Sequence, residues 1–87
     1  MKIIFTKRFE KQYSSASIQI QNKFEEKLNI FLKNKYDKVL NNHSLKGKLK
    51  GHRSINITGD WRAIFKESKN EECAYFVLLG RHSELYN

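Results

Sequence analysis

The sequence predicts an α+β fold in which an N-terminal strand and a helical hairpin precede a three-stranded antiparallel meander. Apolar residues recur at helical spacing up to about residue 34, and after Gly47 the pattern changes to an alternation of apolar and polar residues. Short polar segments with turn-forming residues separate the alternating stretches. The resulting order β-α-α-β-β-β is that of a small two-layer α+β sandwich.

The N-terminal residues predict a strand and a first helix. Residues 2–5 are short and include two isoleucines, which is typical of a strand. Thr6 follows at the position of a helix N-cap, where its hydroxyl can accept a hydrogen bond from a free N–H of the first turn. We therefore predict a helix from residue 7 to about residue 13.

A second helix is predicted after a serine-rich break. Serines at positions 14, 15 and 17 interrupt the first helix, and Ser15 or Ser17 can cap a helix that runs to about Asn34. Apolar residues recur along this helix at spacings of four, four, three and one, which places them on one face. We expect that face to be core, and it consists of Ile20, Phe24, Leu28, Phe31 and Leu32.

Three stretches of the second half predict the meander. A first strand region contains Leu49, Ile55 and Ile57, a second covers residues 61–65 and a third covers residues 75–79. The continuous apolar character of the third stretch indicates a central strand that is covered on both faces. Turns are predicted between the strands, at residues 58–60 and 68–71.

Length and composition indicate one domain spanning residues 1–87. A chain of this size is one small domain, and it contains no repeat or linker. It has no secretory signal or membrane-spanning run, and the single cysteine, Cys73, cannot form an internal disulfide. No Cys/His pair has zinc-ligand spacing. We therefore expect a cytoplasmic protein without membrane contact, metal or other cofactor.

The charge distribution predicts a polyanionic or acidic partner. The chain carries 17 Lys and Arg against nine Asp and Glu, a formal net charge of +8. The bias is sharpest in residues 41–58, which contain basic residues, two glycines and two histidines but no acid. This stretch is either a solvated loop with strand-edge lysines or a phosphate-binding surface, and we favour the second. Its basic residues are Lys46, Lys48, Lys50 and Arg53.

The residue types present suit cleavage of RNA without a metal. In that reaction the 2′-hydroxyl attacks the neighbouring phosphate, so the protein must move two protons and stabilise charge on the phosphate. Histidine suits proton transfer near neutral pH, and His82 is the best placed of the three histidines because it follows the last predicted strand. Trp61 and Tyr86 are aromatic groups on which unpaired bases could stack, although a core position for Trp61 is equally expected.

Other catalytic schemes find less support. Cys73 follows two glutamates, which raise rather than lower the pKa of a thiol, so a thiolate nucleophile is not expected. The sequence contains no Walker loop, no dinucleotide fingerprint and no His-Glu-x-x-His motif. Asp60 could act as a base, but a single aspartate next to a glycine is more often a turn-former.

Three segments resemble the RelE/ParE superfamily of bacterial type II toxins, and within it the RelE/StbE and YafQ-like messenger-RNA interferases. The segments are residues 43–53 (HSLKGKLKGHR), 55–65 (INITGDWRAIF) and 79–86 (LGRHSELY). They occur in the order and at the distances typical of the family. The resemblance implies the RelE/ParE toxin-like fold and a ribosome-dependent endoribonuclease that cuts messenger RNA in the decoding site.

The resemblance also implies which residues are functional. YafQ-like toxins use a histidine in the first segment, an Asp-Trp pair, a histidine after the last strand and a terminal aromatic residue, and RelE-like toxins use two arginines. The sequence departs from the YafQ-like pattern at Asn56, where those toxins carry another histidine, and at Leu78, where they carry an arginine. The implied catalytic set is His43, Asp60, Arg62, Arg81, His82 and Tyr86.

Residue types and resemblance together give each member a role. We expect His82 to be the lead general acid or base and His43 its counterpart, with Asp60 orienting one of them or sharing the proton transfer. The arginines would stabilise the phosphate in the transition state. Substrate binding is assigned to Trp61 and to the basic residues Lys46, Lys48, Lys50 and Arg53.

Two other functions share this fold and remain open from the sequence. A ParE-type toxin inhibits DNA gyrase, although that branch generally lacks the histidine pair. A toxin fold without catalysis could act as an antitoxin- or DNA-binding module. The expected partners are a cognate antitoxin with an acidic segment and messenger RNA on the ribosome, with DNA contacted only through the antitoxin complex.

Overall fold

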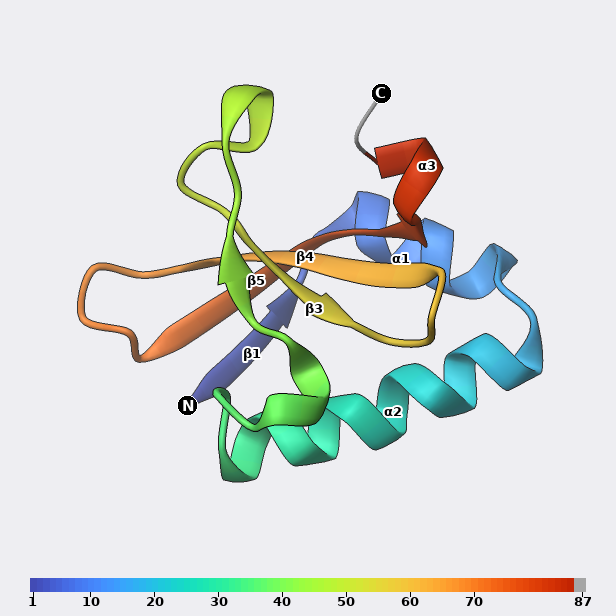
Figure 1. The fold of residues 1–87 in the computed structure, drawn as a ribbon, viewed down its shortest axis with the longest axis horizontal. Helices are drawn as coiled ribbons and strands as arrows, with labels where there is room; N and C mark the ends of the chain where they lie inside the picture. The colour runs from blue at the N-terminus through green and yellow to red at the C-terminus, as the bar shows by residue number, and fades with distance from the viewer. Residues whose placement is uncertain (86–87) are drawn as a thin grey trace.

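The computed structural model describes residues 1–85 and consists of a sheet with helices on one face and along one edge (Figure 1). No helix among these residues has the length and apolar character needed to cross a membrane. The elements are β1 (Lys2–Phe5), α1 (Lys7–Ser15), α2 (Ile18–Lys33), η1 (Lys38–Leu40), β2 (His43–Ser44), η2 (Gly47–Leu49), β3 (Arg53–Asn56), β4 (Trp61–Glu67), β5 (Cys73–Arg81) and α3 (His82–Leu85), where η marks a 3-10 helix.

The sheet confirms the predicted α+β fold and adds one strand. Its five strands lie in the order β1-β5-β4-β3-β2. The meander β3-β4-β5 is antiparallel, and β1 pairs with β5 in parallel. The last long strand, β5, therefore has a neighbour on each side, while β4 is the middle strand. The unexpected strand is β2, which pairs antiparallel with β3 at the edge.

Side-chain caps begin both long helices at the predicted residues. The Thr6 hydroxyl accepts a hydrogen bond from the Phe9 N–H, and the Ser17 hydroxyl accepts one from the Ile20 N–H. Helix α1 is two residues longer than predicted, because the Ser14 hydroxyl donates to the Glu10 carbonyl and is accommodated within the helix. The helical hairpin is otherwise as the sequence predicts.

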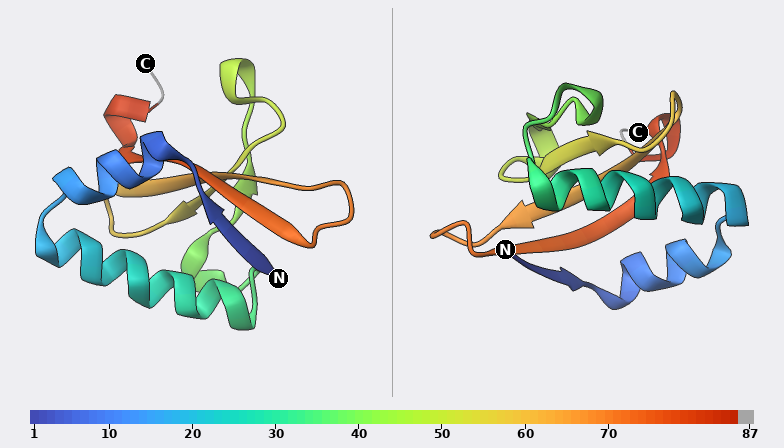
Figure 2. Two further views of the ribbon diagram at one scale, coloured as in Figure 1. Left: turned by 180° about the vertical axis from the view of Figure 1, so that it is seen from behind. Right: turned by 90° about the horizontal axis from the view of Figure 1, so that it is seen from below.

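Helix α2 covers one face of the sheet (Figure 2), and an aromatic cluster forms the core between them. Phe24 and Phe31 of α2 are buried, and both rings contact Phe76 of β5 with centroids 5.8 and 5.6 Å away. The prediction for Leu32 is wrong: its side chain is 49% exposed. Successive helical residues are about 100° apart, so the burial of Phe31 turns Leu32 away from the sheet.

The continuous apolar sequence of β5 is explained by a change of register in the strand pairing and only in part by burial of both faces of the strand. A β-bulge shifts the register, so that Phe65 pairs with Phe76 while the preceding Ile64 pairs with Leu78. Phe76 and Leu79 can therefore both face the core although three positions separate them. The expectation that both faces of this strand are covered is only partly right, because Tyr75 is 37% exposed.

The first predicted strand of the meander begins later than expected. Leu49 lies in η2, not in a strand, and β3 begins at Arg53. Gly47 and Gly51 have φ values of +68° and +89°, a region that side-chain-bearing residues rarely adopt, and they turn the chain into a loop around η2. This loop and α3 both rise from the side of the sheet opposite α2 (Figure 1).

An ion-pair cluster ties the end of the helical hairpin to the β4–β5 turn. The Lys35 ammonium lies 2.7 Å from a carboxylate oxygen of Glu67 and 2.6 Å from one of Glu71. The hydrogen bond from Lys35 lowers the pKa of the Glu71 carboxyl. Burial alone would lower the pKa of Lys35, but hydrogen bonds to both glutamates outweigh it and raise that pKa.

Replacing Lys35 is expected to make the stability of the folded protein less sensitive to acid. The folded state lowers the pKa of Glu71, so its contribution is present above the ordinary pKa of 4.5 and is lost as pH falls through the folded value. Lys35→Met removes that pKa shift. When the pH is lowered from about 7 to about 3, the midpoint temperature of unfolding should therefore fall by a smaller amount in Lys35→Met than in the wild type. Lys23→Met, which breaks only the exposed pair with Glu26, is the control; equal acid sensitivity of all three proteins would contradict the prediction.

Candidate functional site

The candidate site forms where the β3–β4 turn meets the end of β5. Trp61 pairs with Arg81 in the sheet, and the His82 N–H donates a hydrogen bond of 2.8 Å to the Asp60 carbonyl. The Arg81 guanidinium Nε lies 3.8 Å from the Asp60 carboxylate, and both side chains are more than half exposed. Backbone pairing therefore brings Asp60 next to Arg81 and His82, which follow it by more than twenty positions in the chain.

The turn itself is fixed by side-chain hydrogen bonds. The Thr58 hydroxyl accepts from the N–H groups of Asp60 and Trp61. The Arg62 guanidinium donates through Nη1 to the carbonyls of Thr58, Gly59 and Trp61 at 3.0–3.2 Å. Arg62 thus holds the turn that presents Asp60, in addition to any contact with a ligand.

The face of the sheet turned away from α2, here called the distal face, carries several site residues. Strand alternation places Asn56 and Arg62 there as a direct cross-strand pair, with Gly80 next to Arg62 on β5. Ile64 is fully buried but lies outside the core cluster, as expected for a residue on this second face. The distal face is therefore one surface that extends from the β3–β4 turn across the sheet to β2.

His43 lies on the distal face but is not a register neighbour of His82. The cross-strand row that begins at His43 continues through Ser54 of β3 and Ile64 of β4. It reaches β5 at Leu78, four residues before His82. Three strand spacings of about 4.8 Å give roughly 14 Å between β2 and β5. The exposed His43 ring has Nδ1 2.8 Å from the Asn41 carbonyl, so a proton on Nδ1 would leave Nε2 to face solvent.

Unpaired polar atoms lie along β3 and just before it, next to the partners of His43 and Arg62. His52 Nδ1, Ser54 Oγ and Asn56 Oδ1 are buried and have no hydrogen-bond partner among residues 1–85. Ser54 and Asn56 occupy alternate positions along β3 and therefore belong to the distal face, and His52 immediately precedes the strand. Leaving such an atom unsatisfied costs about 1–3 kcal/mol, so a water or a ligand is expected to cover them. No role was predicted for Ser54 or His52 from the sequence. The signal that could have identified them is that polar residues occupy every second position from His52 to Asn56.

The basic segment divides into exposed lysines and an engaged arginine. Lys46, Lys48 and Lys50 are exposed around η2. Arg53 instead donates through Nε to the Asn42 side chain at 2.7 Å and lies over the Tyr36 ring. Alternation along β3 turns Arg53 toward the helical side, away from the distal face, because it pairs with the core residue Phe65. The substrate-binding role expected for Arg53 is therefore not supported by its placement, since local contacts use its guanidinium.

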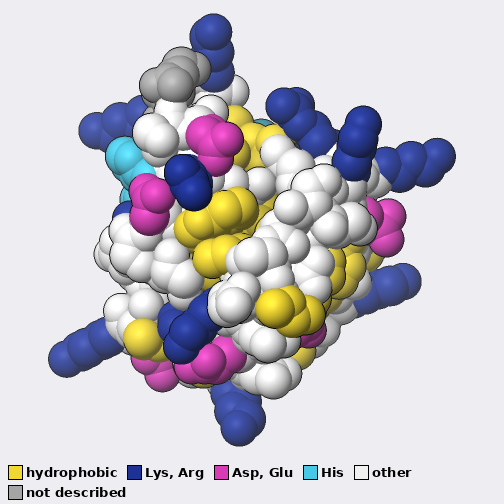
Figure 3. All heavy atoms as spheres, turned by 90° about the vertical axis from the view of Figure 1, so that its right-hand side faces the viewer, with side chains coloured by type: hydrophobic (Ala, Val, Ile, Leu, Met, Phe, Trp, Pro, Cys, Tyr) yellow, Lys and Arg dark blue, Asp and Glu magenta, His cyan; other side chains and the backbone are white. Residues whose placement is uncertain are grey.

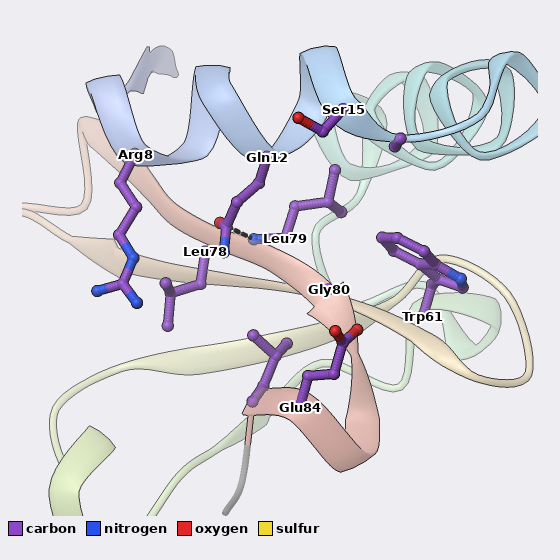
Figure 4. Close-up of a pocket in the computed structure, with 10 residues that line it drawn as sticks. Arg8, Gln12, Ser15, Trp61, Leu78, Leu79, Gly80 and Glu84 are labelled. Carbon is purple, nitrogen blue, oxygen red and sulfur yellow. Dashed lines mark hydrogen bonds between the residues drawn. The ribbon is translucent and has the colours of Figure 1, made fainter.

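Trp61 combines both environments expected for it. It is partly buried and packs against the core cluster, and it also lines a pocket between α1, the end of β5 and α3 (Figure 4). Tyr86 lies outside the described residues. No cluster of three or more His, Cys, Asp or Glu side chains that could hold a metal ion occurs within residues 1–85.

Comparisons with known proteins agree on the family and on the fold. The sequence matches, over residues 1–87, the model of the family described as the bacterial toxin of type II toxin-antitoxin system, YafQ. A comparison with curated proteins finds no match.

Similar solved structures include YafQ from E. coli strain BL21(DE3), which is 22% identical with a TM-score of 0.81 over 99% of this chain and 98% of that one. A chain of the E. coli DinJ-YafQ complex is also 22% identical, with a TM-score of 0.73 over 99% and 98% of the two chains. A chain of the RelBE2 toxin-antitoxin complex from Mycobacterium tuberculosis is 15% identical, with a TM-score of 0.75 over 93% and 96%. The fold is thus that of RelE-like toxins, and the family match over the full sequence shows that this chain belongs to the YafQ family of type II toxins.

Proposed function

We propose that this toxin is an endoribonuclease that cuts messenger RNA in the decoding site of the ribosome, by attack of a ribose 2′-hydroxyl on the adjacent phosphate. The observation that carries the proposal is the meeting of Asp60, Arg81 and His82 at one corner of the sheet. A carboxylate, a guanidinium and an imidazole in one exposed place supply the proton transfer and charge stabilisation that the reaction requires.

Each group has a role that follows from its chemistry. His82 moves a proton, either from the 2′-oxygen or to the departing 5′-oxygen, because an imidazole can both accept and donate a proton. Arg81 donates hydrogen bonds to the phosphate oxygens, which gain charge in the transition state. Asp60 holds the Arg81 guanidinium near the reacting phosphate, since its carboxylate lies 3.8 Å from Arg81 Nε.

The second proton carrier is better assigned to Asp60 than to His43. His43 belongs to β2, and its cross-strand row reaches β5 at Leu78 rather than at His82. Two general catalysts acting on one phosphate must both reach it within hydrogen-bonding distance. His43, near the unpaired polar atoms of β3, instead suits contact with RNA flanking the cut.

The exposed lysines of the η2 loop suit attraction of an RNA backbone. Neutralising Lys48 and Lys50 together, as the Gln/Gln variant, is expected to weaken binding to single-stranded RNA or ribosomes and to lower the slope of log affinity against log salt by about one to two. Binding measured over a range of salt concentrations checks this. Lys23→Gln on α2 provides the control for loss of charge elsewhere, and an unaltered slope in the Lys48/Lys50 variant would show that the loop does not contact phosphate.

A cognate antitoxin is the expected protein partner. Two of the similar structures, DinJ-YafQ from E. coli and RelBE2 from M. tuberculosis, are toxin-antitoxin complexes. This chain carries a formal net charge of +8. An acidic, partly disordered antitoxin segment could therefore wrap the toxin and fold on binding.

Mapping of messenger RNA ends on translating ribosomes tests the proposed function. Addition of the purified toxin to a reconstituted translation system should produce new 5′ ends within codons in the decoding site, detected by primer extension. If expression of the toxin in cells instead stalls replication with gyrase-linked DNA breaks and leaves messenger RNA intact, the toxin is a gyrase inhibitor. Binding of antitoxin without any effect on translation or replication would identify a non-catalytic module.

A further inference from the structure

The pocket between α1, β5 and α3 exists because β1 is shorter than its neighbour. Strand β1 ends at Phe5, opposite Phe76, so the rest of β5 has no strand on that edge. Helix α1 lies along this part of β5, and the Gln12 side-chain oxygen accepts a hydrogen bond of 2.8 Å from the Leu79 N–H. The space left between α1 and α3 has a volume of about 420 Å³.

The lining of this pocket, here called the flank pocket, combines a cation, an aromatic ring and polar groups. Figure 4 shows Arg8 and Trp61 at opposite ends, with Gln12 and Ser15 projecting from α1 between them. The Arg8 side chain makes no hydrogen bond or ion pair with any residue in the described range 1–85. Leucine side chains of β5 and α3 supply an apolar floor. Figure 3 shows hydrophobic side chains with charged side chains around them on one face of the molecule.

The flank pocket shares its wall with the candidate site. Trp61 directly follows Asp60, and Gly80 directly precedes Arg81. Glu84 lines the pocket, and its Oε1 accepts a hydrogen bond of 3.1 Å from the Arg81 N–H. Gly80 lets α3 approach, because a Cβ at this position would lie 3.2 Å from Leu85 Cδ2. A chain of nucleotides with one phosphate at Arg81 would therefore have its neighbour within reach of Trp61.

We propose that the flank pocket binds one nucleotide of single-stranded RNA next to the cleaved linkage. The phosphate of this nucleotide contacts the Arg8 guanidinium, and its base stacks on the Trp61 indole. Gln12 and Ser15 offer hydrogen-bond partners for the ribose hydroxyls. The second carboxylate oxygen of Glu84 can accept a hydrogen bond from an amino or imino group of the base.

The lining favours a nucleotide over a segment of an acidic antitoxin. A nucleotide needs a cation and an aromatic face separated by polar groups, and the flank pocket offers them in that order from Arg8 to Trp61. An acidic side chain could pair with Arg8 but has no ring that would stack on Trp61. The volume also falls within the range of about 300–1,000 Å³ that is typical of small-ligand sites. The proposal rests on the proposed ribonuclease function, since it places substrate beside the cleavage residues.

Trp61 makes the proposal directly testable, because it is the only tryptophan of the chain. An all-2′-deoxy trinucleotide containing guanine or adenine cannot undergo 2′-hydroxyl attack, so it reports binding without cleavage. Its titration into purified, antitoxin-free toxin should quench the Trp61 fluorescence. In Arg8→Ala the dissociation constant should rise about tenfold, and the slope of log affinity against log salt should fall by about 0.7. The control, Lys11→Ala, removes a charge from the same helix outside the pocket and should change affinity by less than about twofold.

The outcomes separate this proposal from the function on which it rests. Equal affinity of the wild type and Arg8→Ala for the trinucleotide would contradict nucleotide binding in the flank pocket, even if the wild type cuts messenger RNA. Quenching that depends on Arg8, in a toxin that does not cut RNA, would support the pocket and contradict the ribonuclease proposal. Loss of antitoxin binding in Arg8→Ala, with trinucleotide binding intact, would assign the pocket to the antitoxin and overturn the proposal.

Discussion

Replacing His82 by alanine is expected to slow messenger RNA cleavage by about 10²- to 10⁴-fold, the usual contribution of a positioned general acid or base. His82 begins α3 directly after β5, and its backbone N–H donates to the Asp60 carbonyl, so the imidazole is attached to a rigid corner of the sheet. Single-turnover cleavage on ribosome complexes measures the effect.

His43→Ala is the matched control for this experiment. Because β2 lies three strands from β5, His43 is expected to affect RNA binding more than the chemical step. Its replacement should therefore raise the substrate concentration needed for half-maximal rate, with the limiting rate changed by less than about tenfold. Equal losses of limiting rate in both variants would restore the paired-histidine mechanism, and unchanged cleavage by His82→Ala would remove His82 from the reaction. Retained antitoxin binding shows that each variant is folded.

Replacing Phe76 by alanine is expected to destabilise the toxin by about 3–5 kcal/mol, the range measured for large aromatic residues in protein cores. The Phe76 side chain is fully buried. Its ring contacts the rings of five other phenylalanines, at centroid distances of 5.2–6.0 Å. The variant leaves a cavity where α1, α2 and the sheet meet. Urea unfolding followed by far-ultraviolet circular dichroism measures the loss.

Two further variants keep this prediction testable if Phe76→Ala does not fold. Phe76→Leu retains much of the volume and should lose clearly less stability than the alanine variant. Tyr75→Ala removes a similar ring from the next residue, which is 37% exposed, and should cost less than about 1.5 kcal/mol. Equal effects at positions 75 and 76 would show that the aromatic cluster is not the main source of stability.

Local signals predicted the elements that depend on local physics. Thr6 and Ser17 were identifiable as caps because the capping hydrogen bond joins residues three positions apart. Helical periodicity located Phe24 and Phe31 in the core. The same periodicity assigned Leu32 to the core wrongly, because a spacing rule does not tell which of two adjacent apolar residues faces the sheet.

Strand pairing between residues far apart in the chain determined the side-chain positions that the sequence pattern did not predict. Strand β2 has two residues and carries no periodic signal, yet it pairs with β3 and fixes His43 on the distal face. Arg53 was grouped with the neighbouring lysines by charge, but its strand position turns it toward Tyr36 and Asn42. The unpaired polar atoms of β3 became visible only once their surroundings were known.

By itself the sequence determined the order of β1, the two long helices and the three meander strands, the core positions of Phe24 and Phe31, and the residue types of the candidate site, because side-chain period, capping and charge are properties of neighbouring residues. The tertiary structure alone decided which of those side chains meet. It joined Asp60 to His82 through one backbone hydrogen bond, placed His43 three strands from β5 and opened the flank pocket where β1 ends. Contacts of this kind depend on strand register and strand length, which are set by the packing of the whole sheet rather than by any single segment.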